Sequence, residues 1–274
     1  MRHEELQHLL DLATSVALEA GRVLSERFSA AGPTQAVTDS ILSKTSRTDL
    51  VTEADHSSER LVISRILAAR PQDAIVAEES GAVDGTSGLT WVVDPLDGTI
   101  NFVYGFPVFG VSIACRSKAA ALLGVVHDPT RGETFTAISG GGAFRDGSPL
   151  ILRQGPAVGE ALVGTGFSYM SERRSAQGRL LAHVLPHVRD IRRAGAAAID
   201  LCWVAAGRLD AFYEAGLAPW DLAAGSLIVT EAGGTVEEVP DLLQPDESGE
   251  GVSTLLAAAP GLGAPLRALL ASAP

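Results

Sequence analysis

Residues 91–102 have the sequence Trp91-Val92-Val93-Asp94-Pro95-Leu96-Asp97-Gly98-Thr99-Ile100-Asn101-Phe102. Three apolar residues predict the end of a buried strand, and two carboxylates follow with a proline in the turn between them. Asp94, Asp97 and the Leu96 carbonyl are oxygen ligands of the kind that a hard cation binds. Gly98 allows the backbone to approach an anion, and the N–H groups at a helix start favour negative charge. The stretch therefore predicts a cation and a phosphate held side by side.

A purely structural interpretation of the same stretch is a turn in which Asp97 caps the following helix and Asp94 faces solvent. An Asp-x-x-Asp-Gly-Thr pattern alone does not separate the two interpretations. The remainder of the chain has to decide between them.

Length and charge restrict the class of protein. The chain has 274 residues, 46% of them apolar, which is enough for a large globular core. Its net charge is −12, and no run of Lys or Arg stands out, which argues against nucleic acid as the main ligand. We expect one domain over residues 1–274 with two halves, about 1–152 and about 153–274.

Two further features concern the compartment. Cys115 and Cys202 both lie in apolar surroundings and are predicted to be reduced core thiols of a cytoplasmic protein. No apolar run has the roughly 18 residues of a membrane span, and the first residues lack the apolar block of a signal peptide. No contact with a membrane is therefore expected.

Apolar periodicity predicts helices and then strands in the first half. The helices are expected over 4–28 and from Asp55 to Pro71, with Asp55 as an N-cap, and a loop over 81–90. Strands are expected within 41–51 and over 74–77, 108–114, 120–127 and 133–138. The first half is thus two helices followed by a largely antiparallel sheet.

The second half alternates between the two kinds of element. Strands are expected over 161–166, 210–214 and 255–259. Helices are expected over 171–186, from Gly195 to about Gly207, over 222–232 and over 264–271. Gly233 and Gly234 close the third of these helices.

Acidic groups stand at the ends of four predicted elements: Asp55, Glu78, the Asp94/Asp97 pair and Asp221. Taken singly, each can be a helix cap or a surface charge. Together, the motifs around them resemble the inositol monophosphatase family over nearly the whole chain. The resemblance rests on residues 91–102, on Trp220-Asp221-Leu222-Ala223-Ala224-Gly225 with Thr230-Glu231-Ala232-Gly233-Gly234, on Asp49-Leu50-Val51-Thr52-Glu53-Ala54-Asp55, and on Ala77-Glu78-Glu79-Ser80.

The resemblance, which is strongest to bacterial members, implies a mixed α/β fold, a layered αβαβα sandwich like that of fructose-1,6-bisphosphatase. It also implies a homodimer that hydrolyses phosphate monoesters. Two to three Mg²⁺ ions per site are implied, with Mn²⁺ as a substitute and Li⁺ and Ca²⁺ as inhibitors.

The resemblance also implies the metal ligands. Glu78, Asp94 and the Leu96 carbonyl match one metal site, and Asp94, Asp97 and Asp221 match the second. Glu78 also matches a ligand of a weaker third ion. Paired cations neutralise the phosphate, lower the pKa of bound water and stabilise the departing alkoxide.

Other matched positions concern the water and the phosphate. Asp55 and Thr99 match the pair that orients the attacking water, with Glu78 beside them. The N–H groups of Gly98 and Thr99 match the phosphate cradle, and Lys44 matches a lysine near the phosphate. No serine or cysteine with a positioned histidine is evident, and all six histidines lie outside the matched motifs, so direct attack by water is expected.

The alcohol side of the substrate is less well defined. Gly195, Ala196, Ala197 and Glu214 match positions that contact the alcohol, and Asp221 matches a further substrate contact. Ala196 stands where many members have Ser or Thr, and Ile100 stands where a threonine is often found. The small phosphorylated polyol expected is inositol 1-phosphate, with histidinol phosphate, fructose 1,6-bisphosphate and 3′-phosphates of nucleotides as rivals. From another class, the rival is a regulatory protein that contacts the transcription machinery.

Overall fold

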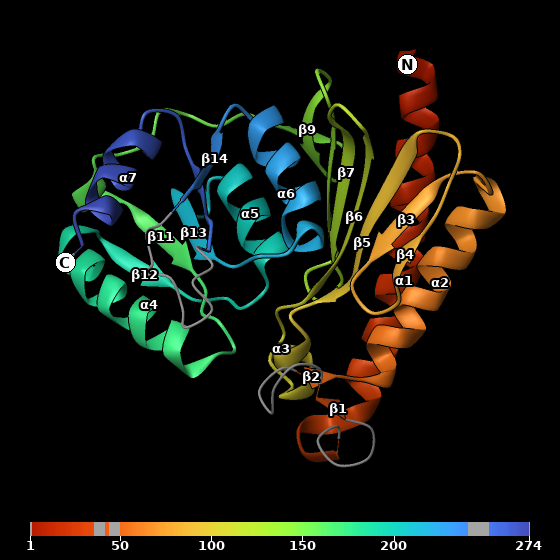
Figure 1. The fold of residues 1–274 in the computed structure, drawn as a ribbon, viewed down its shortest axis with the longest axis horizontal. Coiled ribbons are helices and arrows are strands. Elements are labelled where there is room, and N and C mark those ends of the chain that lie inside the picture. Colours follow the sequence, from red (N-terminus) through yellow and green to blue (C-terminus); the bar gives the residue numbers. More distant parts are fainter. Residues whose placement is uncertain (1, 36–41, 44–49, 241–251, 274) are drawn as a thin grey trace.

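The chain forms five layers in which helices alternate with sheets (Figure 1), in a computed structural model that describes residues 2–35, 42–43, 50–240 and 252–273. Helices α1 and α2 form one outer layer and pack on an eight-stranded sheet. Helices α5 and α6 form the central layer, followed by a five-stranded sheet and the outer helices α4 and α7. The predicted αβαβα sandwich is therefore confirmed.

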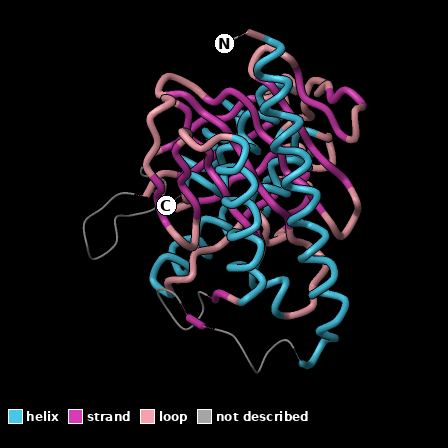
Figure 2. Tube along the Cα trace, turned by 90° about the vertical axis from the view of Figure 1, so that its right-hand side faces the viewer, coloured by secondary structure: helices cyan, strands magenta, loops and turns pink. Residues whose placement is uncertain are grey.

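The outer layer of the first half consists of α1 (His3–Gln35) and α2 (Glu53–Ala69), which pack along each other and across the sheet (Figure 2). The apolar positions predicted for 4–28 form the buried face of α1. The helix continues seven residues past Phe28, the last of these positions. Helix α2 begins after Thr52 rather than after Asp55, so the predicted N-cap is wrong by three residues.

The eight-stranded sheet has the order β10-β9-β8-β7-β6-β5-β3-β4 and is antiparallel except between β3 and β5. Its strands are β3 (Ala74–Ala77), β4 (Gly81–Val83), β5 (Leu89–Asp97), β6 (Gly110–Ser117), β7 (Ala121–Asp128), β8 (Glu133–Ile138), β9 (Gly142–Arg145) and β10 (Ser148–Leu150). Strand β4 lies where a loop was expected. All three of its residues are exposed, so no apolar alternation marks it in the sequence.

Strand β5 extends four residues beyond the apolar run that predicted it, to Asp97. Its register with β6 shifts between Asp94 and Asp97. This irregularity lets the strand continue through Pro95, a residue that cannot donate a ladder hydrogen bond. Both carboxylates therefore lie at the same end of one buried strand.

The second half contains a mixed five-stranded sheet in the order β12-β11-β13-β15-β14. Its strands are β11 (Leu162–Thr165), β12 (Asp190–Arg192), β13 (Ala211–Ala215), β14 (Thr235–Val239) and β15 (Thr254–Ala258). Its helices are α4 (Ser171–Val184), α5 (Ala197–Ala205), α6 (Pro219–Glu231) and α7 (Gly263–Ala271), with short 3₁₀ turns at Val158–Glu160 and Leu185–His187. Strand β14 was not predicted. Two of its five residues are glutamates and only Val239 is buried, so it shows no apolar alternation.

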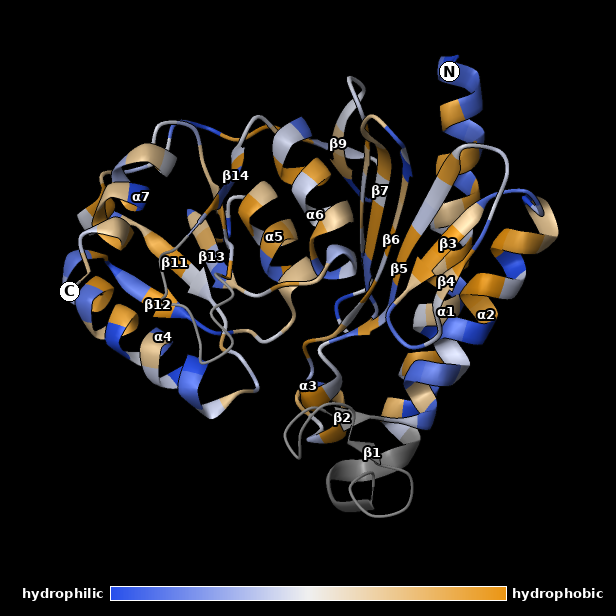
Figure 3. Ribbon diagram, in the orientation of Figure 1, coloured by the Kyte–Doolittle hydropathy of each residue, from blue (hydrophilic) through white to orange (hydrophobic). Residues whose placement is uncertain are grey.

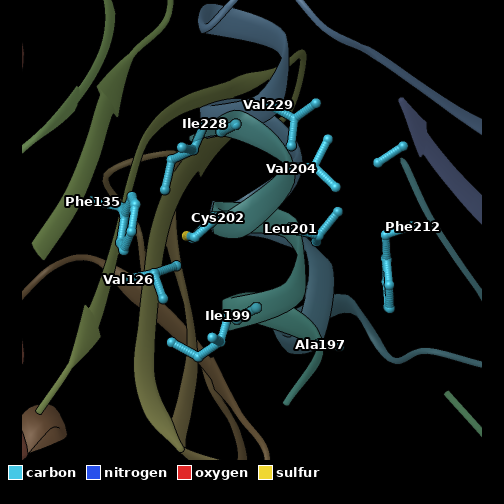
Figure 4. Packing of buried hydrophobic residues seen from close by; sticks show 14 of the residues in the cluster. Val126, Phe135, Ala197, Ile199, Leu201, Cys202, Val204, Phe212, Ile228 and Val229 are labelled. Atoms are coloured by element: carbon cyan, nitrogen blue, oxygen red, sulfur yellow. The ribbon is translucent and has the colours of Figure 1, made fainter. Parts of the chain in front are cut away.

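Helix α5 occupies the centre of the largest hydrophobic cluster, with Ile199 and Cys202 facing the eight-stranded sheet (Figure 4). Leu201 and Val204 face the other way, toward Phe212 of β13. The ribbon coloured by hydropathy shows the same pattern, with apolar residues concentrated on the facing surfaces of the layers (Figure 3). Cys115 and Cys202 are free and buried, as predicted.

The remaining elements lie below the eight-stranded sheet, past the end of β5 (Figure 1). They are the short helix α3 (Thr99–Val103) and the two-stranded ribbon of β1 (Leu42–Ser43) and β2 (Leu50–Val51). Helix α3 begins directly after β5, below the seam between the two halves (Figure 1). Among the described residues, none of the helices is long and apolar enough to cross a membrane.

Candidate active site

A pocket of about 390 Å³ opens where the end of β5 meets the starts of α3, α5 and α6. Ten of the thirteen site residues predicted from the sequence line it, and they come from segments as far apart as residues 78 and 221: Glu78, Asp94, Leu96, Asp97, Gly98, Thr99, Gly195, Ala197, Glu214 and Asp221. The fold therefore brings together motifs that are separated by more than 100 residues.

Asp94 is the most buried acid of the pocket, with 1% of its surface exposed. Its Oδ1 accepts the Leu96 N–H at 3.0 Å, which holds the carboxylate against the turn after β5. Burial raises the pKa of Asp94 well above its ordinary value, and the charges of Glu78, Asp97 and Asp221 raise it further. A side-chain hydrogen bond with Glu78 raises the pKa of Asp94 in the same direction.

Asp97 does not cap the helix that follows it. The N-cap of α3 is Gly98, which makes no side-chain hydrogen bond. The Asp97 carboxylate instead accepts the N–H groups of Ala197 at 3.1 Å and Ala198 at 2.8 Å, in the first turn of α5. Burial raises the pKa of Asp97 to about 7, against the lowering effect of these backbone donors. The structural interpretation of Asp97 as the cap of its own helix is therefore wrong.

Two further helices have an aspartate in their first turn, α6 at the pocket and α2 behind it. In α6, Asp221 accepts the Ala218 N–H at 2.7 Å, and burial together with the Asp97 charge raises its pKa. In α2, Asp55 accepts the N–H of Thr52 at 2.7 Å. Helix N-termini carry partial positive charge, so the starts of α5 and α6 partly offset the repulsion among the acids of the pocket.

Asp55 and Thr99 form a hydrogen-bonded pair behind the acidic cluster. The Thr99 hydroxyl lies 2.9 Å from Asp55 Oδ1 and 3.1 Å from the Leu96 carbonyl, and its single hydrogen is donated to one of them at a time. Asp55 is fully buried, and its second oxygen accepts the Thr52 hydroxyl at 2.6 Å. Thr99 lines the pocket and Asp55 does not, so Asp55 acts on the pocket through Thr99.

Gly98 makes the sharp turn from β5 into α3 with φ +91, in the left-handed region. A Cβ at this position would come within 2.9 Å of the Val108 carbonyl oxygen and 3.2 Å of the Ala196 Cβ. Asn101 then fastens the turn to the segment before α5, because its Nδ2 lies within 2.9 Å of both the Val108 and the Ala194 carbonyls.

The remaining predicted residues are placed differently. Glu214, at the end of β13, lines the pocket, and burial raises its pKa to about 7 against the lowering effect of Arg193. Ala196 is the N-cap of α5 and is 1% exposed, behind the pocket wall rather than on it. Lys44 lies outside the described residues.

Two kinds of lining residue were not assigned a role from the sequence. They are the aromatic residues Phe167, Tyr169 and Trp220, and Arg193, a basic side chain. Trp220 precedes Asp221 in the second matched motif, which was a usable signal. Arg193 precedes Gly195 by two residues, but nothing in the local pattern separates it from Arg192, and both side chains are exposed.

The donor set of the pocket fits divalent cations. Hard cations prefer carboxylate and carbonyl oxygens, which are the donors supplied here by Glu78, Asp94, Leu96, Asp97 and Asp221. In the described part of the chain, no group of three or more His, Cys, Asp or Glu side chains is arranged as a ready-made metal site. Burial and the neighbouring acids raise the pKa values of Asp94, Asp97 and Asp221, and bound cations would offset the repulsion among these acids.

The layered fold is shared with solved structures of inositol monophosphatases and their relatives. The extragenic suppressor protein suhB from Bartonella henselae superposes with a TM-score of 0.85 at 31% identity, over 97% of this chain and 99% of that one. The class defined by the fold is thus that of the inositol monophosphatases and their relatives.

Sequence comparison gives the family. The model of the inositol monophosphatase family matches residues 5–253. The inositol-1-monophosphatase SuhB of Mycobacterium tuberculosis is 44% identical over 84% of this chain and 81% of its own length. The Nus factor SuhB of Escherichia coli is 38% identical over 84% of this chain and 85% of its own. The chain belongs to the inositol monophosphatase family.

Proposed function

We propose that the protein is a Mg²⁺-dependent phosphatase whose preferred substrate is inositol 1-phosphate. The observation that carries the proposal is the convergence of Glu78, Asp94, Asp97 and Asp221 on one pocket. Family membership supports hydrolysis of a phosphate monoester. The name of the M. tuberculosis relative, an inositol-1-monophosphatase, supports the choice of substrate.

In this proposal, Glu78, Asp94 and the Leu96 carbonyl would hold one Mg²⁺, and Asp94, Asp97 and Asp221 would hold a second. Bound there, the ions would neutralise the phosphate, lower the pKa of a bound water and stabilise the departing alkoxide. Asp94 is shared, so it fixes the two positions relative to each other. The N–H groups in the first turn of α5 hold Asp97 in place.

The Thr99–Asp55 pair orients the nucleophile. When Thr99 donates its hydrogen to Asp55, the lone pairs of its oxygen are left to accept a hydrogen from water. A water held this way presents its own lone pair to the phosphorus, on the side opposite the leaving alcohol. The attack is direct, because the described residues of the pocket lining include no cysteine and no histidine. The hydroxyl of Ser168, the one serine among them, accepts the Met170 N–H of its own loop.

The rest of the pocket binds the two ends of the substrate. Gly98 and Thr99 both line the pocket, and their N–H groups are the donors we assign to the phosphate. Glu214, across the pocket, accepts hydrogen bonds from hydroxyls of the alcohol. A homodimer that works in the cytoplasm remains our expectation for the assembly and the compartment.

Phosphate release from a panel of monoesters, measured with Mg²⁺ and with EDTA, tests the proposal. We expect release only with Mg²⁺, and the highest kcat/KM on inositol 1-phosphate. A far higher kcat/KM on histidinol phosphate or fructose 1,6-bisphosphate would refute the choice of substrate. No release from any monoester would refute the phosphatase assignment.

A second, non-catalytic role in contact with the transcription machinery is supported by the name of the E. coli relative, a Nus factor. A pull-down with purified RNA polymerase, with and without Mg²⁺ and inositol 1-phosphate, tests this role. Stable retention that substrate does not alter is the expected outcome, and failure to retain the polymerase at micromolar protein counts against it.

A further inference from the structure

One face of α2 lies against the end of β5 and the turn after β3. Asp55, Ser58 and Glu59 occupy positions i, i+3 and i+4 of this helix, so their side chains point to the same side. Asp55 reaches the pocket through its bond with Thr99. Ser58 and Glu59 are 0% and 4% exposed, and neither belongs to the described lining of the pocket. A glutamate is seldom buried to this degree unless it is paired or hydrogen-bonded.

Ser58 holds a peptide group that in turn holds Asp94. The Ser58 hydroxyl donates to the Pro95 carbonyl at 2.7 Å. That carbonyl belongs to the same planar peptide group as the Leu96 N–H, which donates to Asp94 Oδ1 at 3.0 Å. The pairing of β5 with β6 is irregular between Asp94 and Asp97, so the sheet alone does not set the direction of this peptide group. Ser58 therefore fixes the donor that orients the Asp94 carboxylate.

Glu59 holds the segment that carries Glu78. Its Oε2 accepts the Glu79 N–H at 2.8 Å, and this N–H belongs to the peptide group that directly follows Glu78. The Glu78 N–H itself bonds to the Val93 carbonyl of β5 at 3.2 Å. The main chain at Glu78 is thus held on both sides, by β5 before the residue and by α2 after it.

We propose that Ser58 and Glu59 are positioning residues for the first of the two cations. The ligands assigned to that cation are Glu78, Asp94 and the Leu96 carbonyl. The inference deepens the phosphatase proposed above and rests on it. Ser58 and Glu59 each fix one peptide group next to a ligand. Because they are neighbours on one helix, they also fix the two ligand segments relative to each other.

The two residues should affect the cations differently. Glu59 acts on Glu78, a ligand of the first cation alone. Ser58 acts on Asp94, which both cations share. The remaining ligands of the second cation are held by N–H groups of α5 and of the segment before α6, not by α2. Loss of the Glu59 contact should therefore weaken the binding of one cation, and loss of the Ser58 contact should weaken both.

Calorimetric titration of the metal-free protein with Mg²⁺ measures cation binding without turnover. Residues that hold a metal ligand in place typically contribute about 10–100-fold in affinity, so Glu59→Met should bind one Mg²⁺ about tenfold more weakly and the other as the parent does. Glu78→Gln, which alters a ligand of the first cation alone, identifies the affected ion. Ser58→Ala should weaken both ions.

Two further variants separate positioning from a general effect on α2. Glu59→Gln keeps an acceptor oxygen for the Glu79 N–H and should restore most of the Mg²⁺ affinity lost in Glu59→Met. Ser57→Ala is the matched control, because the Ser57 hydroxyl bonds to Glu53 of its own helix, and it should bind Mg²⁺ as the parent does.

Phosphate release and thermal unfolding complete the test. The Mg²⁺ concentration for half-maximal release from inositol 1-phosphate should rise in Glu59→Met and Ser58→Ala, and saturating Mg²⁺ should restore most of kcat. Variants that melt at a lower temperature in EDTA but bind both ions as the parent does would overturn the inference while the phosphatase stands. Equal weakening of both ions in Glu59→Met would also overturn it. If Glu59→Met does not fold, parental Mg²⁺ binding by Ser58→Ala overturns the inference. A parent that binds no Mg²⁺ and releases no phosphate overturns the phosphatase and the inference together.

Discussion

Replacing Asp94 by asparagine should make the metal-free protein more stable, although it removes a residue from the centre of the site. Asparagine has the size of aspartate, and its Oδ1 can still accept the Leu96 N–H. The change removes one negative charge from a buried cluster in which Glu78, Asp97 and Asp221 all raise the pKa of Asp94. If Asp94 were only a structural turn residue, the same replacement would be neutral or destabilising.

The size of the effect follows from the neighbouring acid. The pKa of Asp97 is raised from 3.8 to about 7, and about 1.4 kcal/mol per pKa unit makes its ionisation in the folded state cost about 4 kcal/mol at pH 8. Asp94 is less exposed than Asp97 and its pKa is raised in the same direction. Allowing for relaxation and water entry, we expect a gain of at least about 1 kcal/mol, or about 2–4 °C in Tm for a chain of this size.

Thermal unfolding at pH 8 in EDTA and in excess Mg²⁺ measures the effect. In EDTA, Asp94→Asn should melt at a higher temperature than the parent. Asp84→Asn, a control at an exposed aspartate, should melt at the same temperature as the parent. In Mg²⁺ at about 100 times Kd, the parent should gain about 2.7 kcal/mol by mass action and the Asp94 variant much less. A variant that melts clearly below the parent in EDTA, or gains as much as the parent from Mg²⁺, would refute the shared-metal role of Asp94.

Three further predictions concern the nucleophile, pH and the turn. Thr99→Ala and Asp55→Asn should each lower kcat by about 10²-fold or more, and Thr99→Ser should lower it much less. The fall in kcat of the double variant Thr99→Ala/Asp55→Asn should be far smaller than the product of the two single falls. A multiplicative fall would show that the two residues act separately. Between pH 4 and 7, Asp97 keeps its proton in the folded protein but has lost it in the unfolded chain. In EDTA, the free energy of unfolding should therefore fall as pH rises through this window, by up to about 4 kcal/mol for this group. Urea titrations that show a rise instead would contradict the raised pKa of Asp97. Gly98→Ala should lower the free energy of unfolding by more than about 1 kcal/mol and lower phosphatase activity, because φ is +91 and the new Cβ would meet the Val108 carbonyl. A variant that is as stable in urea and as active as the parent would show that the turn can adopt another conformation.

The sequence was most informative where chemistry and periodicity coincide. Residues 91–102 combine a buried strand with oxygen ligands and a glycine, and the structure places all three features at one edge of the pocket. The periodic face of α1 was equally clear, since a helix that covers a sheet has to bury one side. Both signals are local, and local signals can be found in one sequence.

Long-range contacts were out of reach for the same reason. The bonds from Ala197 and Ala198 to Asp97 join residues about 100 positions apart, and nothing near Asp97 marks α5 as its partner. Strands β4 and β14 lack an apolar alternation, because edge strands pair through the backbone and leave their side chains in solvent. Arg193 could be separated from Arg192 only once the fold had placed one of them in the pocket.

Phosphate release from inositol 1-phosphate by EDTA-treated protein, followed as Mg²⁺ is added back, tests the central claim most directly. In EDTA, the parent and Asp84→Asn should release no phosphate above background, and both should regain activity when Mg²⁺ is added. Asp94→Asn should stay at least about 10³-fold less active at every Mg²⁺ concentration, because the ligand shared by both ions is lost. Undiminished release in EDTA, or near-parental release by Asp94→Asn, would contradict the assignment of this pocket as a metal-dependent phosphatase centre.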